Sequence, residues 1–282
     1  MQHLCPPSFL NNGLMEKKEK ACAYPLWGRI LAQVYERAIL RQLFHFPLCW
    51  VPPQRGDKMN LTELNKKYDE MQLKYGDPNL KSIFYGGCNE KPDICFVFMN
   101  PTGKNIASYP DWAGIRAPWI GTKNIWNLFV AIGKFDEGIY KEIKKRKPKD
   151  WTPEFANQVY SEITRNKIFL TNLGKCTQTD ATLISNKIYF EYLALLEREI
   201  EIIAPKVIVL FGNQVSTVFL NQNISVSQCR KKQFAKDIGG KAFKCFPVFY
   251  PVGNGRANIG KSIEDIKWIY ENVLSTEGEK QC

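Results

Sequence analysis

Four short apolar runs constrain the fold of this chain more than any other feature of its sequence. They cover residues 94–99, 167–171, 207–211 and 246–250. Each is rich in β-branched or aromatic residues and is bounded by polar residues, glycine or proline, which is typical of strands buried on both faces of a sheet. Helical patterns separate the runs. This alternation predicts an α/β fold, a three-layer α/β/α sandwich with a central, mostly parallel four-stranded sheet.

Three stretches between or after these runs place apolar residues at helical spacing. Ser185 is a candidate N-cap of the second stretch, and Pro205 is a natural stop for it. Ser262 and Asp265 resemble a capping box, which predicts that the third helix begins there. The three stripes are Ile125, Leu128, Phe129 and Ile132; Tyr189, Leu193, Leu196, Ile200 and Ile203; and Ile263, Ile266, Tyr270 and Val273.

Residues 1–58 differ in pattern from the rest of the chain. Residues 21–53 are rich in aromatic residues, leucine and proline without a sustained period, whereas an amphipathic helix pattern follows Met59. One hypothesis is that Met59 is the native first residue, because codons for the preceding Arg-Gly-Asp-Lys can form a purine-rich ribosome-binding site. The alternative is a genuine N-terminal helix that covers the domain. We expect residues 59–282 to form a single domain.

Charge and cysteine spacing narrow the classes of partner and cofactor. The formal net charge of +11 favours a polyanionic partner, although a generally basic surface has the same composition. Nine cysteines are scattered without a Cys-x-x-Cys pair, which suits neither zinc nor an iron–sulfur cluster, so we expect no metal and no cofactor. No apolar run is long enough to span a bilayer, so we expect a cytoplasmic protein without a membrane partner.

Histidine is confined to the N-terminal segment. The two histidines are His3 and His45, so residues 59–282 contain none. Mechanisms that need an imidazole, such as a Ser-His-Asp triad or a histidine-ligated metal, are therefore excluded from the predicted domain.

The ends of the predicted strands indicate where a ligand would bind. In open α/β sheets, ligands bind outside the carboxyl ends of the strands. That edge receives residues 100–103, Asn172, residues 212–213 and residues 250–253. Two of these tips present a side-chain amide and two present turn-forming residues. Their convergence predicts a binding site more strongly than any single motif does.

The Thr-Gly-Lys at residues 102–104 suggests a phosphate-binding P-loop, but the rest of that motif is missing. A P-loop needs glycine, four further residues, and then Gly-Lys-Ser/Thr. Here Phe98 occupies the first position and Asn105 the last. Because the turn glycine and the magnesium-binding hydroxyl are both absent, a P-loop NTPase is disfavoured.

Two side chains near the strand tips have both a structural and a functional interpretation. Trp119 lies in a glycine-flanked loop before a helix pattern, where it either packs in the core or stacks on a planar ligand. Asn172 either caps the next turn or reads the edge of a nucleobase with its one acceptor and two donors.

A glycine-rich basic loop precedes the last helix pattern. Such loops suit close approach to phosphates, although an ordinary solvated loop has the same composition. The basic runs at residues 144–149 and 230–232 are open to the same two interpretations. The loop residues concerned are Gly253, Gly255, Gly260, Arg256 and Lys261.

Taken in order, these segments resemble the uracil-DNA glycosylase superfamily over roughly residues 80–275. Met-Asn-Pro at residues 99–101 is similar to the first motif of the asparagine-bearing branches, the single-strand-selective and the thymine/mismatch-specific glycosylases. Residues 117–121 resemble the segment whose aromatic ring stacks on the flipped base. Asn172 matches the strand-end asparagine that binds the pyrimidine.

The resemblance continues in the second half of the chain, with one departure. Residues 204–215 are similar to the third strand of the family and its following glycine turn. Residues 250–260 occupy the place of the His-Pro-Ser motif, and residues 257–260 resemble the corresponding loop of the single-strand-selective branch. Tyr250 stands where most branches carry histidine, although the mismatch-specific branches also lack it.

The resemblance implies a monofunctional, monomeric DNA glycosylase that flips out uracil or a related deaminated or damaged base and hydrolyses its N-glycosidic bond without a cofactor. Asn100 would orient the attacking water, which implies slow turnover because an amide is no general base. Backbone N–H groups after Asn100 would stabilise charge on the departing base. The alternative is a catalytically weak or inactive nucleic-acid-binding relative. The implied site residues are Asn100 and Tyr250 for catalysis; Met99, Pro101, Trp119 and Asn172 for the base; and Gly253, Gly255, Arg256 and Lys261 for DNA phosphates.

Overall fold

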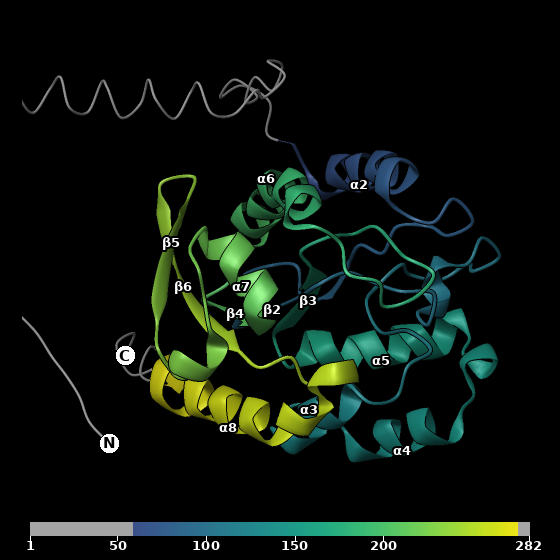
Figure 1. The fold of residues 1–282 in the computed structure, drawn as a ribbon. Coiled ribbons are helices and arrows are strands. Elements are labelled where there is room, and N and C mark those ends of the chain that lie inside the picture. The colour runs from purple at the N-terminus through teal and green to yellow at the C-terminus, as the bar shows by residue number, and fades with distance from the viewer. Residues whose placement is uncertain (1–58, 276–282) are drawn as a thin grey trace, which may run out of the picture. The chain divides into compact units, whose positions relative to one another are not determined.

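The computed structural model describes residues 59–275, in which helices cover both faces of one sheet (Figure 1). Residues 1–58, which include His3 and His45, and residues 276–282 lie outside the described residues. The hypothesis on Met59 as the native start, and the single domain expected for residues 59–282, therefore stay predictions.

The sheet has six strands in the order β1-β3-β2-β4-β6-β5. The four inner strands are parallel to one another, and each edge strand is antiparallel to its neighbour. The predicted α/β sandwich is confirmed, and each predicted run overlaps an inner strand, but the expected number of four strands was wrong. The strands are β1 (Tyr85–Gly87), β2 (Ile94–Phe98), β3 (Ile168–Asn172), β4 (Val207–Phe211), β5 (Phe234–Ile238) and β6 (Lys241–Val248).

The two strands that sequence patterns missed lack the signal of a buried strand. β1 has only three residues, two of which are glycine. β5 includes Lys236 and Asp237 and alternates in exposure along its length, as edge strands with a solvated face do. Neither strand contains an apolar run, so the pattern detects only the inner strands.

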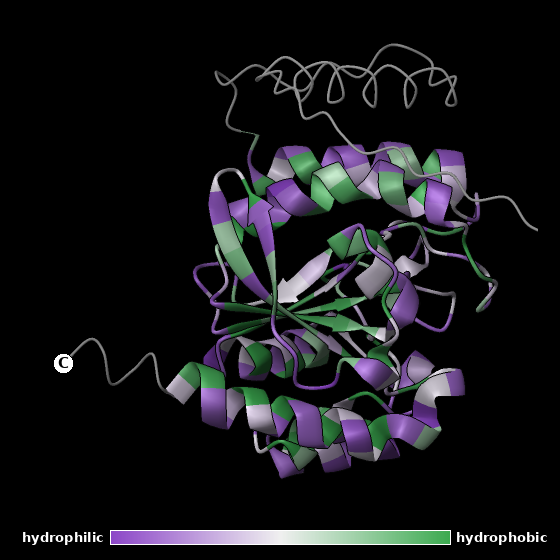
Figure 2. Ribbon diagram, turned by 60° about the vertical axis from the view of Figure 1, so that its left-hand side comes forward, coloured by the Kyte–Doolittle hydropathy of each residue, from purple (hydrophilic) through white to green (hydrophobic). Residues whose placement is uncertain are grey.

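The helices form one layer on each face of the sheet (Figure 1). α2, α6 and α7 pack on one face, and α3, α5 and α8 pack on the other, with α4 beside α3. Figure 2 shows that the central strands are apolar while the helices are apolar on the side that faces them. The helices are α2 (Leu61–Tyr75), α3 (Trp126–Ala131), α4 (Glu137–Lys145), α5 (Pro153–Arg165), α6 (Asn186–Ile203), α7 (Gly212–Leu220) and α8 (Ile259–Ile269). Short 3₁₀ helices η1 (Ile106–Ser108), η2 (Pro148–Asp150), η3 (Val226–Gln228) and η4 (Gly253–Asn258) and a π-helical turn η5 (Tyr270–Leu274) connect or extend them.

Helix boundaries follow the predicted signals in α6 but not in α8. Ser185 stands at the N-cap position of α6, and the helix ends at Ala204 in the left-handed conformation, directly before Pro205. The predicted capping box of the last helix was wrong, because α8 already begins at Ile259. Ser262 lies inside α8 and donates to the carbonyl oxygens of Phe249 and Asn258, a back-bonding pattern available to serine within helices.

Residues on β2 contribute alternately to two cores. Phe96 and Phe98 are buried in the cluster on the α3, α5 and α8 side, whereas Cys95 and Val97 are buried in the cluster on the α2, α6 and α7 side. This alternation is expected, because successive side chains of a strand point to opposite faces. The residues that follow β2 therefore leave the sheet between two separate helix layers.

Candidate active site

The carboxyl ends of β2 and β3 bring two carboxamides together. Phe98 pairs with Asn172 in the parallel ladder, and the N–H groups of Leu173 and Gly174 donate to Phe98 O at 2.7 Å and Met99 O at 2.9 Å. These bonds hold the segment after β3 against the segment after β2. Both asparagines line one cavity of about 270 Å³ at this edge, the edge where the α/β topology predicts a site. The cavity is lined by Asn100, Pro101, Thr102, Lys104, Asn105, Pro118, Trp119, Thr122, Lys123, Asn124, Ile125, Asn172, Ala181, Tyr250, Val252 and Gly253.

The carboxamide of Asn100 is held at both ends. The Tyr189 hydroxyl of α6 donates to its Oδ1 at 2.7 Å, and its Nδ2 donates to Pro101 O at 3.1 Å. Burial raises the pKa of Tyr189, so the hydroxyl keeps its proton and remains a donor. A Cβ at Gly174 would lie 2.9 Å from the Tyr189 ring, so glycine leaves room for this ring. One lone pair of Asn100 Oδ1 remains for a further donor.

The carboxamide of Asn172 is buried but keeps an unused donor. The residue is 2% exposed, and its Nδ2 has no hydrogen-bond partner among the described residues. Leaving a buried amide N–H unsatisfied costs about 1–3 kcal/mol, so a group of this kind in a cavity wall points to a ligand. Its backbone is fixed independently, because Lys175 Nζ donates to Asn172 O at 2.9 Å.

Trp119 supplies an aromatic wall from a strained turn. Its φ angle is +70°, a region that non-glycine residues rarely adopt. The Thr122 hydroxyl donates to Trp119 O at 2.7 Å, and the Tyr160 hydroxyl donates to Pro118 O, so both sides of the turn are held. The indole packs edge-to-face on Phe98 with ring centroids 5.0 Å apart, and its buried N–H has no partner among the described residues.

Tyr250 closes the cavity from the end of β6. Its ring packs edge-to-face on Phe98 and on Phe211, with centroids 6.4 Å and 6.5 Å apart. Burial raises the pKa of its hydroxyl, so the side chain is a neutral donor at ordinary pH. A Cβ at Gly255 would lie 2.0 Å from Tyr250 O. Glycine is therefore required beneath the Tyr250 backbone.

These residues follow the order of one known family along the chain. The family model of the uracil DNA glycosylase superfamily matches residues 85–272, which include both amides, Trp119 and Tyr250. The chain belongs to the uracil DNA glycosylase superfamily. A search of curated proteins gave no significant match. Membership of this superfamily indicates a DNA glycosylase that hydrolyses N-glycosyl bonds.

Within this glycosylase fold, some predicted residues lie away from the cavity. Met99 does not line it and packs against the core cluster on the α6 side. Gly253 lines the cavity, while Arg256 is exposed in η4 beside it. Lys261 is exposed in α8, where its Nζ lies 3.4 Å from Asn258 Oδ1. These placements put Arg256 and Lys261 outside the cavity wall and leave their contact with phosphate a prediction.

Two features predicted to bind the ligand form contacts within the protein. Of the N–H groups after Asn100, those of Gly103 and Asn105 donate to Gln178 O at 2.8 Å and Thr102 O at 2.9 Å. The stabilisation of a departing base by N–H groups of this segment stays a prediction. In the basic run 230–232, Arg230 bonds Asp265 and Glu264, and Lys231 also bonds Glu264, so contact of this run with phosphate stays a prediction. Its contacts attach the η3 region to α8.

A buried ion pair behind Asn172 escaped the sequence analysis. Lys175 and Glu199 are both fully buried, with Nζ and Oε1 3.1 Å apart. The Tyr68 hydroxyl donates to the other carboxylate oxygen at 3.0 Å, and Thr171 donates to Oε1 at 2.5 Å. Burial lowers the pKa of Lys175, and the adjacent Glu199 opposes that shift. The available signal was a lysine within the otherwise apolar segment that follows β3.

Residues 59–275 contain no group of three or more histidine, cysteine or acidic side chains that could hold a metal ion. Among the same residues, no helix combines the length and apolar character needed to cross a bilayer. No carboxylate and no histidine lines the cavity. Its polar side chains are amides, hydroxyls, the indole of Trp119 and the ammonium groups of Lys104 and Lys123.

Proposed function

We propose that this protein removes uracil, or a related deaminated or damaged base, from DNA by hydrolysing its N-glycosidic bond without cutting the strand. The observation that carries the proposal is the meeting of Asn100, Asn172, Trp119 and Tyr250 around one cavity of about 270 Å³. Superfamily membership supports the reaction class. Asparagine at position 100 supports one of the asparagine-bearing branches. That the protein is monomeric and cytoplasmic stays a prediction.

Base recognition rests on Asn172 and Trp119. A glycosylase first extracts the nucleotide from the stack, which costs a few kcal/mol. The unpaired Nδ2 of Asn172 would donate to a carbonyl oxygen of the base, while its Oδ1 accepts the neighbouring ring N–H. The indole of Trp119 offers a flat surface for stacking. The unused donor of Asn172, its Nδ2, would then acquire a partner.

Bond cleavage would depend on Asn100 and Tyr250. Breaking the glycosidic bond leaves positive charge on the sugar and negative charge on the base. Asn100, fixed by Tyr189, would accept a hydrogen bond from the attacking water and orient it toward the sugar. The neutral hydroxyl of Tyr250 would donate to the departing base anion, in place of the histidine of most branches. Because neither residue is a strong base, we expect slow turnover.

The proposal is tested by measuring abasic-site formation on oligonucleotides that each carry one uracil, hypoxanthine or other damaged base. We expect product with at least one base in single or double strands, and strand breakage only after alkali. Asn100→Ala and Asn172→Ala should each lower the rate by roughly 10²–10³-fold, the usual cost of losing one positioned polar group. Asn127→Ala is the matched control, because Asn127 is an exposed asparagine on α3. Undiminished product from both site variants would refute the assignment.

The absence of a carboxylate or histidine from the cavity wall favours one alternative, a nucleic-acid-binding relative with little or no activity. The same oligonucleotides distinguish the two. Binding that prefers a modified base and depends on Asn172, without any abasic product, would replace the glycosylase with a damage-binding protein.

A further inference from the structure

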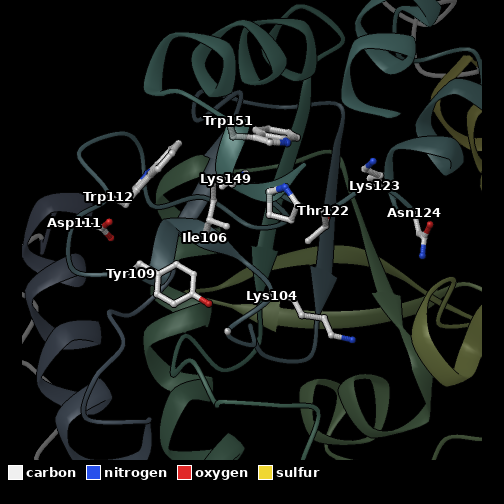
Figure 3. A pocket seen from close by; sticks show the side chains of 13 residues that line it. Lys104, Ile106, Tyr109, Asp111, Trp112, Thr122, Lys123, Asn124, Lys149 and Trp151 are labelled. Atoms are coloured by element: carbon white, nitrogen blue, oxygen red, sulfur yellow. The ribbon is translucent and has the colours of Figure 1, made fainter. Parts of the chain in front are cut away.

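A second hollow shares part of its wall with the base cavity, and Figure 3 shows the side chains that line it. It has a volume of about 920 Å³, compared with about 270 Å³ for the cavity. The two share Lys104, Thr122, Lys123 and Asn124 as a common wall. A chain of nucleotides with one residue in the cavity would therefore continue into this groove.

Three aromatic rings line the groove from two separate segments, residues 109–112 and Trp151 (Figure 3). Tyr109, which follows η1, is 43% exposed. Trp112 is half-buried and oriented by a hydrogen bond from its Nε1 to Ile115 O at 2.9 Å. Trp151 is 4% exposed and its Nε1 has no partner among the described residues. Rings at a groove surface, one with an unused N–H, point to a ligand with flat faces and acceptor atoms.

Cations surround the same rings. Lys104 and Lys149 are exposed and form no ion pair with a described residue, while Lys123 Nζ donates to Lys144 O at 2.6 Å. Lys149 is the last residue of the basic run 144–149, so this run ends at the wall of the groove. The carboxylate of Asp111 is the one acidic group among the lining residues. The balance of charge favours a polyanion.

We propose that this groove binds a single strand of nucleic acid next to the extruded nucleotide. Bases would stack on Tyr109 and Trp112, phosphates would contact Lys104 and Lys149, and the Trp151 N–H would donate to a phosphate or base oxygen. A duplex cannot use these rings, because its bases already stack on each other, whereas unpaired bases present free faces. The proposal rests on the proposed function only in taking the cavity as the place of the extruded base.

The test uses the full-length protein and a labelled oligothymidylate of about twelve residues that carries no modified base. Fluorescence anisotropy should show tighter binding of this strand than of a duplex of the same length. Tyr109→Ala should weaken single-strand binding roughly 5- to 150-fold, the range for losing one stacked base. Phe190→Ala is the matched control, because Phe190 is a similarly exposed ring on α6, 45% exposed.

Charge is tested by the salt dependence of the same binding. Lys149→Gln should reduce the slope of log affinity against log salt by about 0.7, the value for one phosphate contact on a single strand. Lys141→Gln, an exposed lysine of α4, should leave the slope unchanged. Asp111→Asn should raise affinity, because it removes the repulsion of phosphates. Should circular dichroism show that Tyr109→Ala is misfolded, the exposed Lys149 and Asp111 variants decide the question.

Equal affinity for strand and duplex, or unchanged affinity in Tyr109→Ala and Lys149→Gln, overturns the proposal. The outcomes separate it from the proposed function. Asn172→Ala should lose base excision while it retains oligothymidylate binding. Binding through the groove by a protein that excises no base would leave the groove assigned and refute the glycosylase. Base excision that persists without groove-dependent binding would support the glycosylase and refute the assignment of the groove.

Discussion

The two helix layers on either side of the sheet differ in what they bury. On the α3, α5 and α8 side, the buried carboxylates of Glu162 and Asp265 each pair with an arginine that stays accessible to solvent. On the α2, α6 and α7 side, the core includes the fully buried pair Lys175–Glu199 and a tyrosine hydroxyl bonded to it.

This difference continues into the cavity. The layer with the fully buried ion pair supports the two carboxamides, because Tyr189 of α6 holds Asn100 and Lys175 holds the backbone of Asn172. The other layer supports the rings, because Trp119 and Tyr250 pack on phenylalanines of its core cluster. The cavity is thus lined by carboxamides held by one layer and by rings held by the other. A planar, polar-edged ligand such as a base can contact both.

The largest effect on the difference between the two layers is expected from removing the buried cation, Lys175. Lys175→Met leaves Glu199 charged and unpaired in the core, so we expect a loss of about 3–5 kcal/mol in the free energy of unfolding. Urea unfolding measures it. The matched control is Lys67→Met, which removes an exposed pair with Glu70 and should cost less than about 1 kcal/mol.

The double variant Lys175→Met/Glu199→Met sharpens the same point. It replaces both charges with apolar side chains, so much of the stability should return. If Lys175→Met alone were as stable as the wild type, the layer of α2, α6 and α7 would not depend on its ion pair.

Alkaline pH should destabilise the side of the sheet covered by α2, α6 and α7 in particular. Cys95 and Cys245 are buried there, and burial raises the pKa of both thiols from 9.0, to about 12 for Cys245. Above pH 9 the unfolded thiols lose protons while the folded ones keep them, so stability present below pH 9 falls as pH rises. The expected loss is about 1.4 kcal/mol for each thiol by pH 10.

Urea unfolding between pH 7 and pH 10 measures this loss. The double variant Cys95→Ala/Cys245→Ala should show a shallower decline over the same range. An identical decline in the variant would assign the effect to other groups.

The smallest effect is expected from removing the hydrogen bond between Tyr189 of α6 and Asn100. Tyr189→Phe removes the donor to Asn100 Oδ1, so the amide is no longer held at both ends. If the protein is a glycosylase, kcat should fall roughly five- to tenfold with little change in KM, as for one hydrogen bond. Tyr192→Phe is the control, because this hydroxyl of the same helix bonds neither carboxamide. Equal rates in the two variants would leave Tyr189 without a positioning role.

The inner strands and the four residues that meet at the cavity were predictable from sequence. Buried parallel strands leave apolar runs, and parallel strands end at one edge, so the residues after them converge. Asn100, Trp119, Asn172 and Tyr250 follow from that rule and from the family resemblance. Met99 was predicted to contact the base but packs on the α6 side instead, because a shift of one residue along the chain reverses the face to which a side chain points.

The supporting contacts were not predictable from local patterns. Tyr189 fits the apolar stripe of its helix, and nothing in that stripe indicates that its hydroxyl reaches Asn100, 89 positions away in the chain. Lys175 and Glu199 are likewise brought together only by the packing of α6 on the sheet. Hydrogen bonds between distant elements depend on how layers pack, and sequence periodicity carries no information about them.

The cavity wall contains Tyr250 and no histidine, which has a consequence for the conditions under which the protein can act. The cavity wall contains no side chain of a type that ordinarily titrates between about pH 4 and 8, and the Tyr250 pKa is raised further from that range. Mild acidification of the surroundings would therefore leave the charge of the pocket unaltered. The rate would stay level across a span in which a histidine-dependent relative gains or loses its proton.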